Sequence, residues 1–365
     1  MNAEVLNAGG LSAEGSANTS ATKQIPALDG IRAISILIVF LSHAGLGYIV
    51  PGGFGVTVFF FLSGFLITTL LIREYDRKAT IALPYFYMRR VLRLAPPILI
   101  TLLAAGILVV FGLVEGALDV PTLMSDIFFY YNYFSLYGAA REIDGTGILW
   151  SLSVEEHFYL IWPALFLIFA AGRMQLGHMV WLLAGLLAWR VLRVLVFGSE
   201  EWVVYISTDT RLDSLLYGCL LALMNWRGLS ARLFPAGWSR HLIVLAALAV
   251  LVASFALRDV MFRSTLRYTV QGIALIPLFY YATTFPETPY FKPLDWPVVR
   301  RVGVYSFTLY LSHYVILKGL MYQGIAESGS IRLMVLGAVL SLGFAAAVYR
   351  FIEKPMLPLR RRFAG

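Results

Sequence analysis

The chain has 365 residues, of which 59% are hydrophobic and only 14% are charged, and its formal net charge is +8. Soluble globular proteins are about 25% charged, so this composition excludes a soluble enzyme, a disordered protein and a secreted disulfide scaffold. Apolar stretches of about 20 residues recur along nearly the whole chain and predict a polytopic membrane protein. The single cysteine, Cys219, excludes an intrachain disulfide and a cysteine-based metal cluster.

The apolar segments predict an all-α bundle of about ten transmembrane helices. They cover 31–49, 53–72, 94–114, 151–171, 178–197, 212–225, 241–257, 267–284, 304–322 and 331–349. Residues 1–24 are polar, with no basic segment before an apolar one, which is typical of a disordered tail and not of a signal peptide. We therefore predict an N-terminal tail over 1–24, a transmembrane domain over 25–355 and a basic C-terminal tail over 356–365.

Lys and Arg are unevenly distributed between the two sides of the predicted bundle. If the N-terminus is cytoplasmic, most of the 29 basic residues fall on the inner side, whereas the long outer loop 115–149 holds only Arg141. The positive-inside rule then predicts that both termini are cytoplasmic. The net charge is thus a signal of topology and of contact with membrane lipids, and it indicates no nucleic-acid partner.

The first span carries two ionisable side chains on one face. Arg32 and His43 are eleven residues apart, close to three helical turns, so His43 lies about 16–18 Å along the axis from Arg32. A lone histidine in a bundle is more often a hydrogen-bonded structural residue. The shared face, and the proton transfer that a neutral imidazole performs near pH 7, favour a functional His43.

Three arginines lie between the second and third spans. In a helix, Arg90 and Arg93 share a face, and with Arg89 they form a cluster that suits a polyanion with several phosphates. Ordinary positive-inside flanking explains the same residues, and taken alone it is the simpler explanation.

The fourth span opens with Trp150 and continues into two carboxylates and a histidine, Glu155, Glu156 and His157. Such groups are costly inside a membrane unless they are paired or hydrated, which indicates a functional site. Acidic side chains near a helix N-terminus are also favourable where they lie in the water of the lipid headgroups. The residues by themselves leave both interpretations open.

Two further groups of charges lie in later spans. Asp209 and Asp213 flank Arg211, and we expect a structural ion-pair cluster that cages this arginine. Arg350 and Glu353 are spaced i,i+3 and are expected to pair. The ninth span adds further polar candidates, which are Tyr305, Tyr310, Ser312 and His313.

These motifs, taken in order, resemble the acyltransferase-3 family, a group of polytopic bacterial proteins that acylate sugars. They are LDGIRA at 28–33 leading to His43, GFGV at 53–56, FLSGF at 61–65, RRVLRLAP at 89–96, WSLSVEE at 150–156, TDTRLD at 208–213, YLSH at 310–313 and EKP at 353–355. The resemblance covers almost everything from residue 26 to residue 355. It implies a multi-pass acyltransferase domain in the bacterial cytoplasmic (inner) membrane.

The resemblance also implies roles for individual residues. His43, with Arg32 and Glu155, is the expected catalytic group of an O-acetyltransferase, and His43 acts either as general base or as transient acyl carrier. Glu155 orients or stabilises His43 if the first and fourth spans are adjacent. The donor is acyl-CoA, usually acetyl-CoA, and its phosphates are expected at Arg89, Arg90 and Arg93.

The expected acceptor is a hydroxyl of a sugar in a surface or secreted glycan. Trp150 and the aromatic segment 128–137 are expected to stack on sugar rings, and Asp29 and Glu353 are further substrate-binding candidates. Two departures from the family pattern are expected: no esterase-like domain of the kind that some relatives carry after the last span, and Ser312 where relatives often have Trp. We expect no metal, and the oligomeric state is open.

A transporter or flippase of a glycolipid is the alternative function. Polar groups in the membrane and aromatic residues at the outer side fit it, but no internal repeat is evident. A phosphate-rich donor also explains the cluster of Arg89, Arg90 and Arg93 better than a transported glycolipid does.

Overall fold

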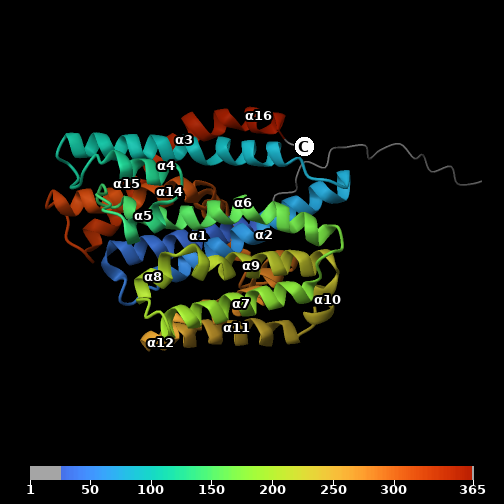
Figure 1. Cartoon of the computed structure of the whole chain (residues 1–365). Helices are drawn as coiled ribbons and strands as arrows, with labels where there is room; N and C mark the ends of the chain where they lie inside the picture. Colours follow the sequence, from blue (N-terminus) through green and yellow to red (C-terminus); the bar gives the residue numbers. More distant parts are fainter. Residues whose placement is uncertain (1–25, 364–365) are drawn as a thin grey trace, which may run out of the picture.

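The computed structural model describes residues 26–363, and within them it is built of helices (Figure 1). The described part has no strand beyond one isolated bridge between Gly116 and Ile143. The all-α prediction is therefore confirmed. The predicted tail over 1–24 lies outside the described residues, and most of the predicted basic tail lies in a short final helix, α16 (Lys354–Arg362).

Ten of the described helices are 16 residues or longer, and each overlaps one predicted span in the predicted order. They are α1 (Pro26–Leu41), α2 (Gly52–Lys78), α3 (Leu83–Val110), α6 (Trp150–Ala170), α7 (Leu176–Leu195), α9 (Thr208–Trp226), α11 (Ser239–Ala256), α13 (Arg267–Thr284), α14 (Pro297–Tyr322) and α15 (Ile331–Val348). The helix α3 begins well before its predicted span, so the arginine cluster is helical.

Among the described residues, seven helical stretches are long and apolar enough to cross a membrane. They are Ala27–Leu46, Gly52–Lys78, Leu83–Val110, Thr146–Ala170, Leu176–Leu195, Ser239–Ala256 and Ile331–Arg362. The helices α9, α13 and α14 are also long, but they lack a stretch of that apolar character. The chain is thus an all-α, multi-pass membrane protein, whereas the count of ten spans and the cytoplasmic placement of both termini stay predictions.

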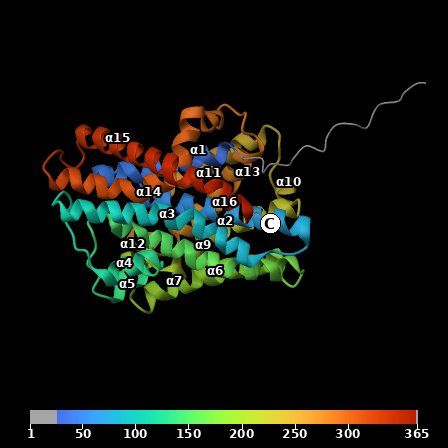
Figure 2. The same ribbon diagram turned by 90° about the horizontal axis from the view of Figure 1, so that it is seen from above.

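The long helices run side by side, and the described chain begins and ends at the same end of the bundle (Figures 1 and 2). We name this the termini end, because it holds Pro26 and Phe363. The opposite end is the loop end, which carries the 111–149 segment. That segment includes two short helices, α4 (Val120–Ile127) and α5 (Tyr131–Tyr137).

A very close backbone approach joins α2 to α9. A Cβ atom at Gly64 would lie 1.9 Å from the Leu215 carbonyl oxygen, and one at Gly218 would lie 2.0 Å from the Phe61 carbonyl oxygen. Only glycine fits at these two positions. Small residues therefore place α9 against α2 at the centre of the bundle, where nearly all of α9 is buried.

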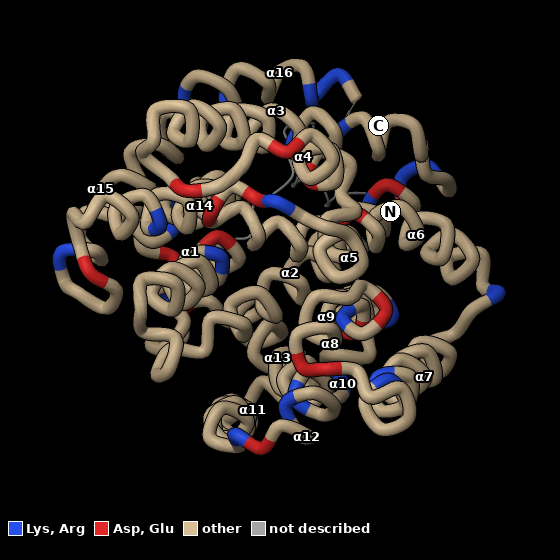
Figure 3. The backbone as a smooth tube through the Cα atoms, turned by 60° about the vertical axis from the view of Figure 1, so that its left-hand side comes forward, with Lys and Arg blue, Asp and Glu red and all other residues tan. Residues whose placement is uncertain are grey.

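The charges of α9 form ion pairs, but the predicted partners are wrong. Asp213 accepts from the buried Arg190 of α7 at 2.6 Å, and Asp209 pairs with Arg193 at 3.0 Å. Figure 3 shows acidic and basic residues together at the start of α9. Arg211 is not caged by these carboxylates, because Arg190 and Arg193 of α7 pair with them instead. The sequence around Arg211 does not show that α7 lies beside α9.

Arg211 is instead enclosed by aromatic rings. Its guanidinium lies 3.9 Å from the ring centre of Tyr268 and 5.2 Å from that of Tyr205, and its Nη2 donates to Thr57 Oγ1 at 3.0 Å. The side chain is 0% exposed. Cation–π contacts and hydrogen bonds therefore replace the expected carboxylates as its surroundings.

Candidate active site

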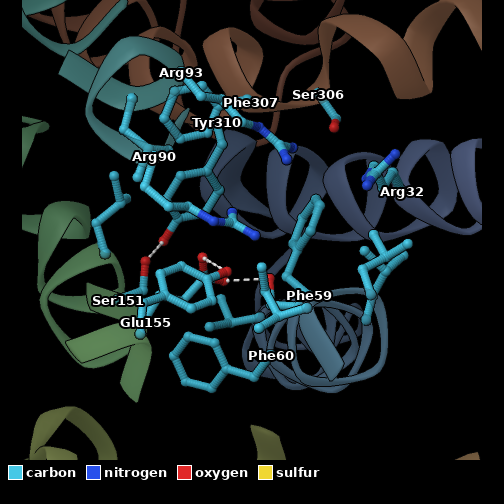
Figure 4. Close-up of a pocket in the computed structure, with 18 residues that line it drawn as sticks. Arg32, Phe59, Phe60, Arg90, Arg93, Ser151, Glu155, Ser306, Phe307 and Tyr310 are labelled. Atoms are coloured by element: carbon cyan, nitrogen blue, oxygen red, sulfur yellow. Dashed lines mark hydrogen bonds between the residues drawn. The ribbon is translucent and has the colours of Figure 1, made fainter. Parts of the chain in front are cut away.

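A cavity of about 80 Å³ lies between α1, α2, α3, α6 and α14 (Figure 4). Its walls are largely apolar, with a polar lining drawn from five helices. The polar residues are Arg32, Ser63, Arg90, Arg93, Ser151, Glu155, Tyr159, Ser306 and Tyr310. Three arginines and one glutamate from α1, α3 and α6 thus line one cavity.

Helix α3 presents Arg90 and Arg93 to this cavity, as the i,i+3 spacing predicts. The guanidinium of Arg90 lies 4.4 Å from the ring centre of Tyr159 and 5.7 Å from that of Phe86. Stacking on aromatic rings holds the group while leaving its N–H donors at the ring edge available to an anion.

Arg89 does not line the cavity with Arg90 and Arg93. Its Nη2 pairs with Glu74 at 3.0 Å, and its Nη1 donates to the Phe363 carbonyl oxygen at 2.5 Å. Arg89 therefore connects α2, α3 and the end of the chain. Its position departs from the expected donor-binding role, because adjacent residues on a helix point about 100° apart.

Arg32 lines the cavity from α1, and Asp29 supports it from one turn earlier. Arg32 Nη1 lies 2.5 Å from Asp29 Oδ1, and the side chain of Asp29 is 5% exposed. Asp29 is not among the residues that line the cavity. Its geometry fits the orientation of Arg32 better than contact with a substrate.

Glu155 faces the arginines across the cavity. Its oxygens accept hydrogen bonds from Ser63 Oγ at 3.1 Å and from Tyr159 OH at 3.2 Å. Ser151, Glu155 and Tyr159 are spaced four residues apart on α6, so they share one helix face, and all three line the cavity. The carboxylate therefore lies inside the protein, and headgroup water does not explain it.

His43 follows α1 in a π-helical turn, η1 (Ser42–Leu46). The turn contains Gly45 with a φ of 107°, and a Cβ atom there would lie 2.2 Å from the Gly329 backbone nitrogen. Gly329 N also donates to the Ala44 carbonyl oxygen at 2.8 Å. Single π-helical turns within α-helices often occur at functional sites, because they redirect the side chains that they carry.

The partner of His43 is His313 of α14, and not Glu155. The two side chains meet at 2.9 Å between His43 Nδ1 and His313 Nε2, and their rings stack with centres 5.1 Å apart. The expected contact with Glu155 required α1 beside α6, but both helices pack on α2. The helix that brings a partner to His43 is α14, one of the closest neighbours of α1.

The histidine pair lies outside the cavity, on the loop-end side of Arg32. Neither His43 nor His313 lines the cavity, whereas Tyr310 does. The ring centre of Tyr310 lies 5.9 Å from that of His313, and its hydroxyl is 2.8 Å from Ser151 Oγ. Tyr310 therefore separates the arginine-lined cavity from the histidine pair.

Trp150 does not offer a free face to a sugar. It is 4% exposed, and its ring packs against Tyr205 at 4.7 Å and Phe60 at 6.1 Å between ring centres. The aromatic segment 128–137 differs, because Phe128 and Tyr137 are 68% and 73% exposed. A tryptophan at the head of a span is as suitable for the core as for the membrane surface, and the core holds this one.

Glu353 lies in a second π-helical turn, η4 (Tyr349–Glu353), which joins α15 to α16. Its Oε1 accepts from Thr308 Oγ1 of α14 at 2.7 Å. No ion pair with Arg350 occurs among the described residues, so the expected i,i+3 pair does not form. Glu353 instead fastens this turn to the helix that carries Ser306 and Tyr310.

A larger cleft opens at the loop end beside the η1 turn, with a volume of about 700 Å³. The η1-to-α2 connection, α8 (Glu201–Ile206), α11, α12 (Val260–Ser264) and α13 line it. Tyr48 and Trp202 are exposed at its edge by 82% and 55%. The charged residues of the lining are Glu201, Arg258, Arg263 and Arg267. Sequence reasoning did not find this cleft, because its residues are scattered over five segments.

No group of three or more His, Cys, Asp or Glu side chains in residues 26–363 is placed to hold a metal ion.

Comparison with known proteins places the chain among acyltransferases. A family model described as "Acyltransferase domain" (Acyl_transf_3) matches residues 25–350. The chain is 27% identical over 351 residues to "Putative O-acetyltransferase SACOL0978" of Staphylococcus aureus (strain COL), covering 91% of this chain and 57% of that protein. It is 28% identical over 355 residues to "Peptidoglycan O-acetyltransferase OatA" of Listeria monocytogenes, covering 92% and 56%. The chain thus spans a little over half the length of these curated relatives, and no solved structure matches it.

Proposed function

Because the chain belongs to the acyltransferase-3 family, we propose that it moves an acyl group, most simply acetyl, from acyl-CoA to a hydroxyl of a glycan. One observation carries this proposal. A cavity lined by three arginines and a histidine pair lie along the first span, and the eleven residues from Arg32 to His43 correspond to about 16 Å of helix. We further propose that the protein acts in the bacterial inner membrane, with the termini end in the cytoplasm.

The cavity is the proposed site for the phosphates of the donor. Guanidinium groups bind phosphate through charge-assisted, paired hydrogen bonds. Arg32, Arg90 and Arg93 supply three such groups, and Glu155 holds the surrounding hydroxyls in place. Acyl-CoA is an extended molecule with phosphates at one end of its arm and the thioester at the other. Such a shape fits the separation between the arginines and His43.

His43 is the proposed general base. It takes the proton of an acceptor hydroxyl while that oxygen attacks the thioester carbonyl carbon. The carbon–sulfur bond breaks, and the CoA thiolate leaves and recovers the proton. Transient acylation of the same imidazole is the alternative route, in which the acyl group reaches the nitrogen first and the hydroxyl second.

The cleft at the loop end is the proposed site for the glycan, in place of Trp150. Exposed rings of Tyr48 and Trp202 are suited to stacking on sugars, and Ser42, which lines the cleft, precedes His43 in sequence. Its volume lies in the range of ligand pockets, about 300–1,000 Å³. The name of the Listeria relative makes peptidoglycan the first acceptor to examine.

The test is mass spectrometry of surface and secreted glycans from three strains of the source organism. One lacks the gene, one is restored with the wild type, and one is restored with His43→Ala. A glycan should lose one acyl mass on deletion and regain it with the wild type only. His241→Ala serves as the matched control, because His241 lies on α11 away from both cavities.

Two outcomes would contradict the proposal. Normal acylation by His43→Ala, at wild-type protein levels in the membrane, removes His43 from the chemistry. An unmodified glycan that accumulates or changes location on deletion, with no change in acyl content, favours a transporter.

A further inference from the structure

His313 is completely enclosed and makes three hydrogen-bond contacts through its two ring nitrogens. It is 0% exposed. Its Nδ1 lies 3.0 Å from the Leu309 carbonyl oxygen and 2.9 Å from the Tyr310 carbonyl oxygen, both one helical turn earlier on α14. Its Nε2 lies 2.9 Å from His43 Nδ1. Every polar atom of this ring therefore has a defined partner.

The identity of these partners determines where the protons are. A carbonyl oxygen only accepts hydrogen bonds, so His313 Nδ1 carries a proton and donates. A neutral ring with that proton has a lone pair on Nε2, which only accepts. The proton between the two rings consequently lies on His43 Nδ1, and the lone pair of His43 lies on Nε2.

We propose that His313 is a positioning residue that fixes the tautomer of His43 and leaves His43 Nε2 as the atom that receives the acceptor proton or the acyl group. This inference rests on the proposed function. The order of roles is that of a base oriented by a second group, with an imidazole and two backbone carbonyls in place of a carboxylate. When His43 gains a proton on Nε2, its Nδ1–H continues to donate to His313, so the contact persists through the reaction.

The surroundings of His43 support a fixed ring. Its face stacks on the ring of Tyr314 with centres 4.2 Å apart. Lys318 of α14 lies 5.3 Å from the centre of the same Tyr314 ring, and it pairs with Asp144 of the loop segment at 3.2 Å. Since Asp144 is engaged by Lys318, the hydrogen bond that His43 Nδ1–H donates to His313 Nε2 is the interaction that decides the tautomer of His43.

The experiment compares two substitutions at one position. His313→Gln can place an amide oxygen where Nε2 lies, and it keeps an acceptor for His43 Nδ1–H. His313→Met has a similar length and no comparable acceptor. We expect His313→Met to lower kcat about 10–100-fold, the range seen when a metal-bound histidine loses the hydrogen bond that orients its ring. The KM for acyl-CoA should be unchanged, and His313→Gln should recover most of the rate.

Nitrogen NMR of labelled histidine in the membrane-embedded full chain measures the tautomer without any reaction. The chain has five histidines, so single replacements assign each signal. In the wild type, His43 should carry its proton on Nδ1, and in His313→Met it should become a mixture of tautomers. His241→Gln should leave the His43 signal unchanged.

Two results would overturn the inference: a His43 signal protonated on Nε2 in the wild type, or equal loss of kcat in His313→Gln and His313→Met with both proteins folded. A failed glycan assay contradicts the proposed function instead, because the NMR result does not depend on acyl transfer. The two failures are therefore distinguishable.

Discussion

At the residue scale, neighbouring arginines on α3 have different surroundings. Arg90 and Arg93 line the cavity, whereas Arg89 pairs with Glu74. The i,i+3 spacing predicted which two share a face, because that relation follows from helix geometry alone. It did not predict the partner of Arg89, which comes from another helix and from the end of the chain.

We predict that replacing Arg90 and Arg93 together with Ala weakens acetyl-CoA binding at least about tenfold. Loss of charge-assisted hydrogen bonds at about 1.5–3 kcal/mol each is enough for that change. Binding of acetyl-CoA to the purified protein measures the effect. Arg89→Ala is the matched control and should keep wild-type affinity. An unchanged affinity in the double variant would remove the cavity from the donor site.

The partner of His43 shows the limit of local reasoning. The sequence placed Arg32 and His43 on one helix face, and it offered His313 as one of several polar residues in the ninth span. Which helix lies beside the first span is decided by packing between segments 270 residues apart in sequence. The contact with Glu155 was expected only if the first and fourth spans are adjacent, and such adjacency cannot be obtained from spacing within a helix.

At the element scale, the η1 turn depends on one glycine. Gly45 has a φ of 107°, and any side chain there would meet the Gly329 backbone. Backbone strain of this kind costs about 1–3 kcal/mol, in addition to the overlap. The turn sets the direction of His43, so the element and the chemistry are connected.

Gly45→Ala is therefore expected to lower both thermal stability and acyl transfer. Gly343→Ala is its control, because Gly343 lies within α15 and a Cβ atom there meets nothing within 4 Å. That control should be neutral or slightly stabilising, since Ala is favoured over Gly in a helix. Thermal unfolding and glycan acylation of both variants measure the difference. Wild-type behaviour of Gly45→Ala would show that the turn tolerates a side chain.

The loop segment provides a pH-dependent element outside the long helices. Asp126 of α4 is 3% exposed, and its carboxylate oxygens have no hydrogen-bond partner among residues 26–363. Burial, and then the nearby charge of Glu142, raise the pKa of Asp126 to about 8. The folded segment thus retains a proton that the unfolded chain releases near its ordinary value of about 3.9.

Stability of this segment should consequently fall as the pH rises from about 4 to about 8, because the folded state binds more protons than the unfolded state in that window. Asp126→Asn should reduce this dependence and raise resistance to proteolysis of the 111–149 segment at pH 8. Asp119→Asn is the control. Hydrogen bonds from Thr122 lower the pKa of Asp119, so it does not titrate in the same window. Equal pH dependence in wild type and Asp126→Asn would contradict the assignment.

At the scale of the whole molecule, the two ends of the bundle have different surroundings. The termini end is adjacent to Arg89 and the final helix, and the loop end carries the cleft with Tyr48 and Trp202. A donor from one side and an acceptor from the other would meet between them, near His43. This arrangement requires the termini end to face the cytoplasm.

Cysteine labelling in intact cells tests that orientation. Cys219 is buried and 0% exposed, so it gives little background to an impermeant thiol reagent. Arg141→Cys at the loop end should be labelled from outside, and Arg361→Cys at the termini end only after the membrane is permeabilised. The opposite pattern would reverse the topology and place the arginine cavity away from cytoplasmic acyl-CoA.

The sequence by itself determined the all-α membrane class of this protein, the order of its long helices and the shared face of Arg90 and Arg93. Hydrophobic runs and the spacing of these two arginines depend only on local geometry and on the cost of polar groups in a membrane. The tertiary structure alone decided that His43 meets His313, that Trp150 is buried and that Arg211 lies among aromatic rings. Those outcomes depend on which helices pack together. Helix pairs such as α2 and α9 approach closely because small residues on one helix meet the backbone of the other, and these residues are distributed over the whole chain.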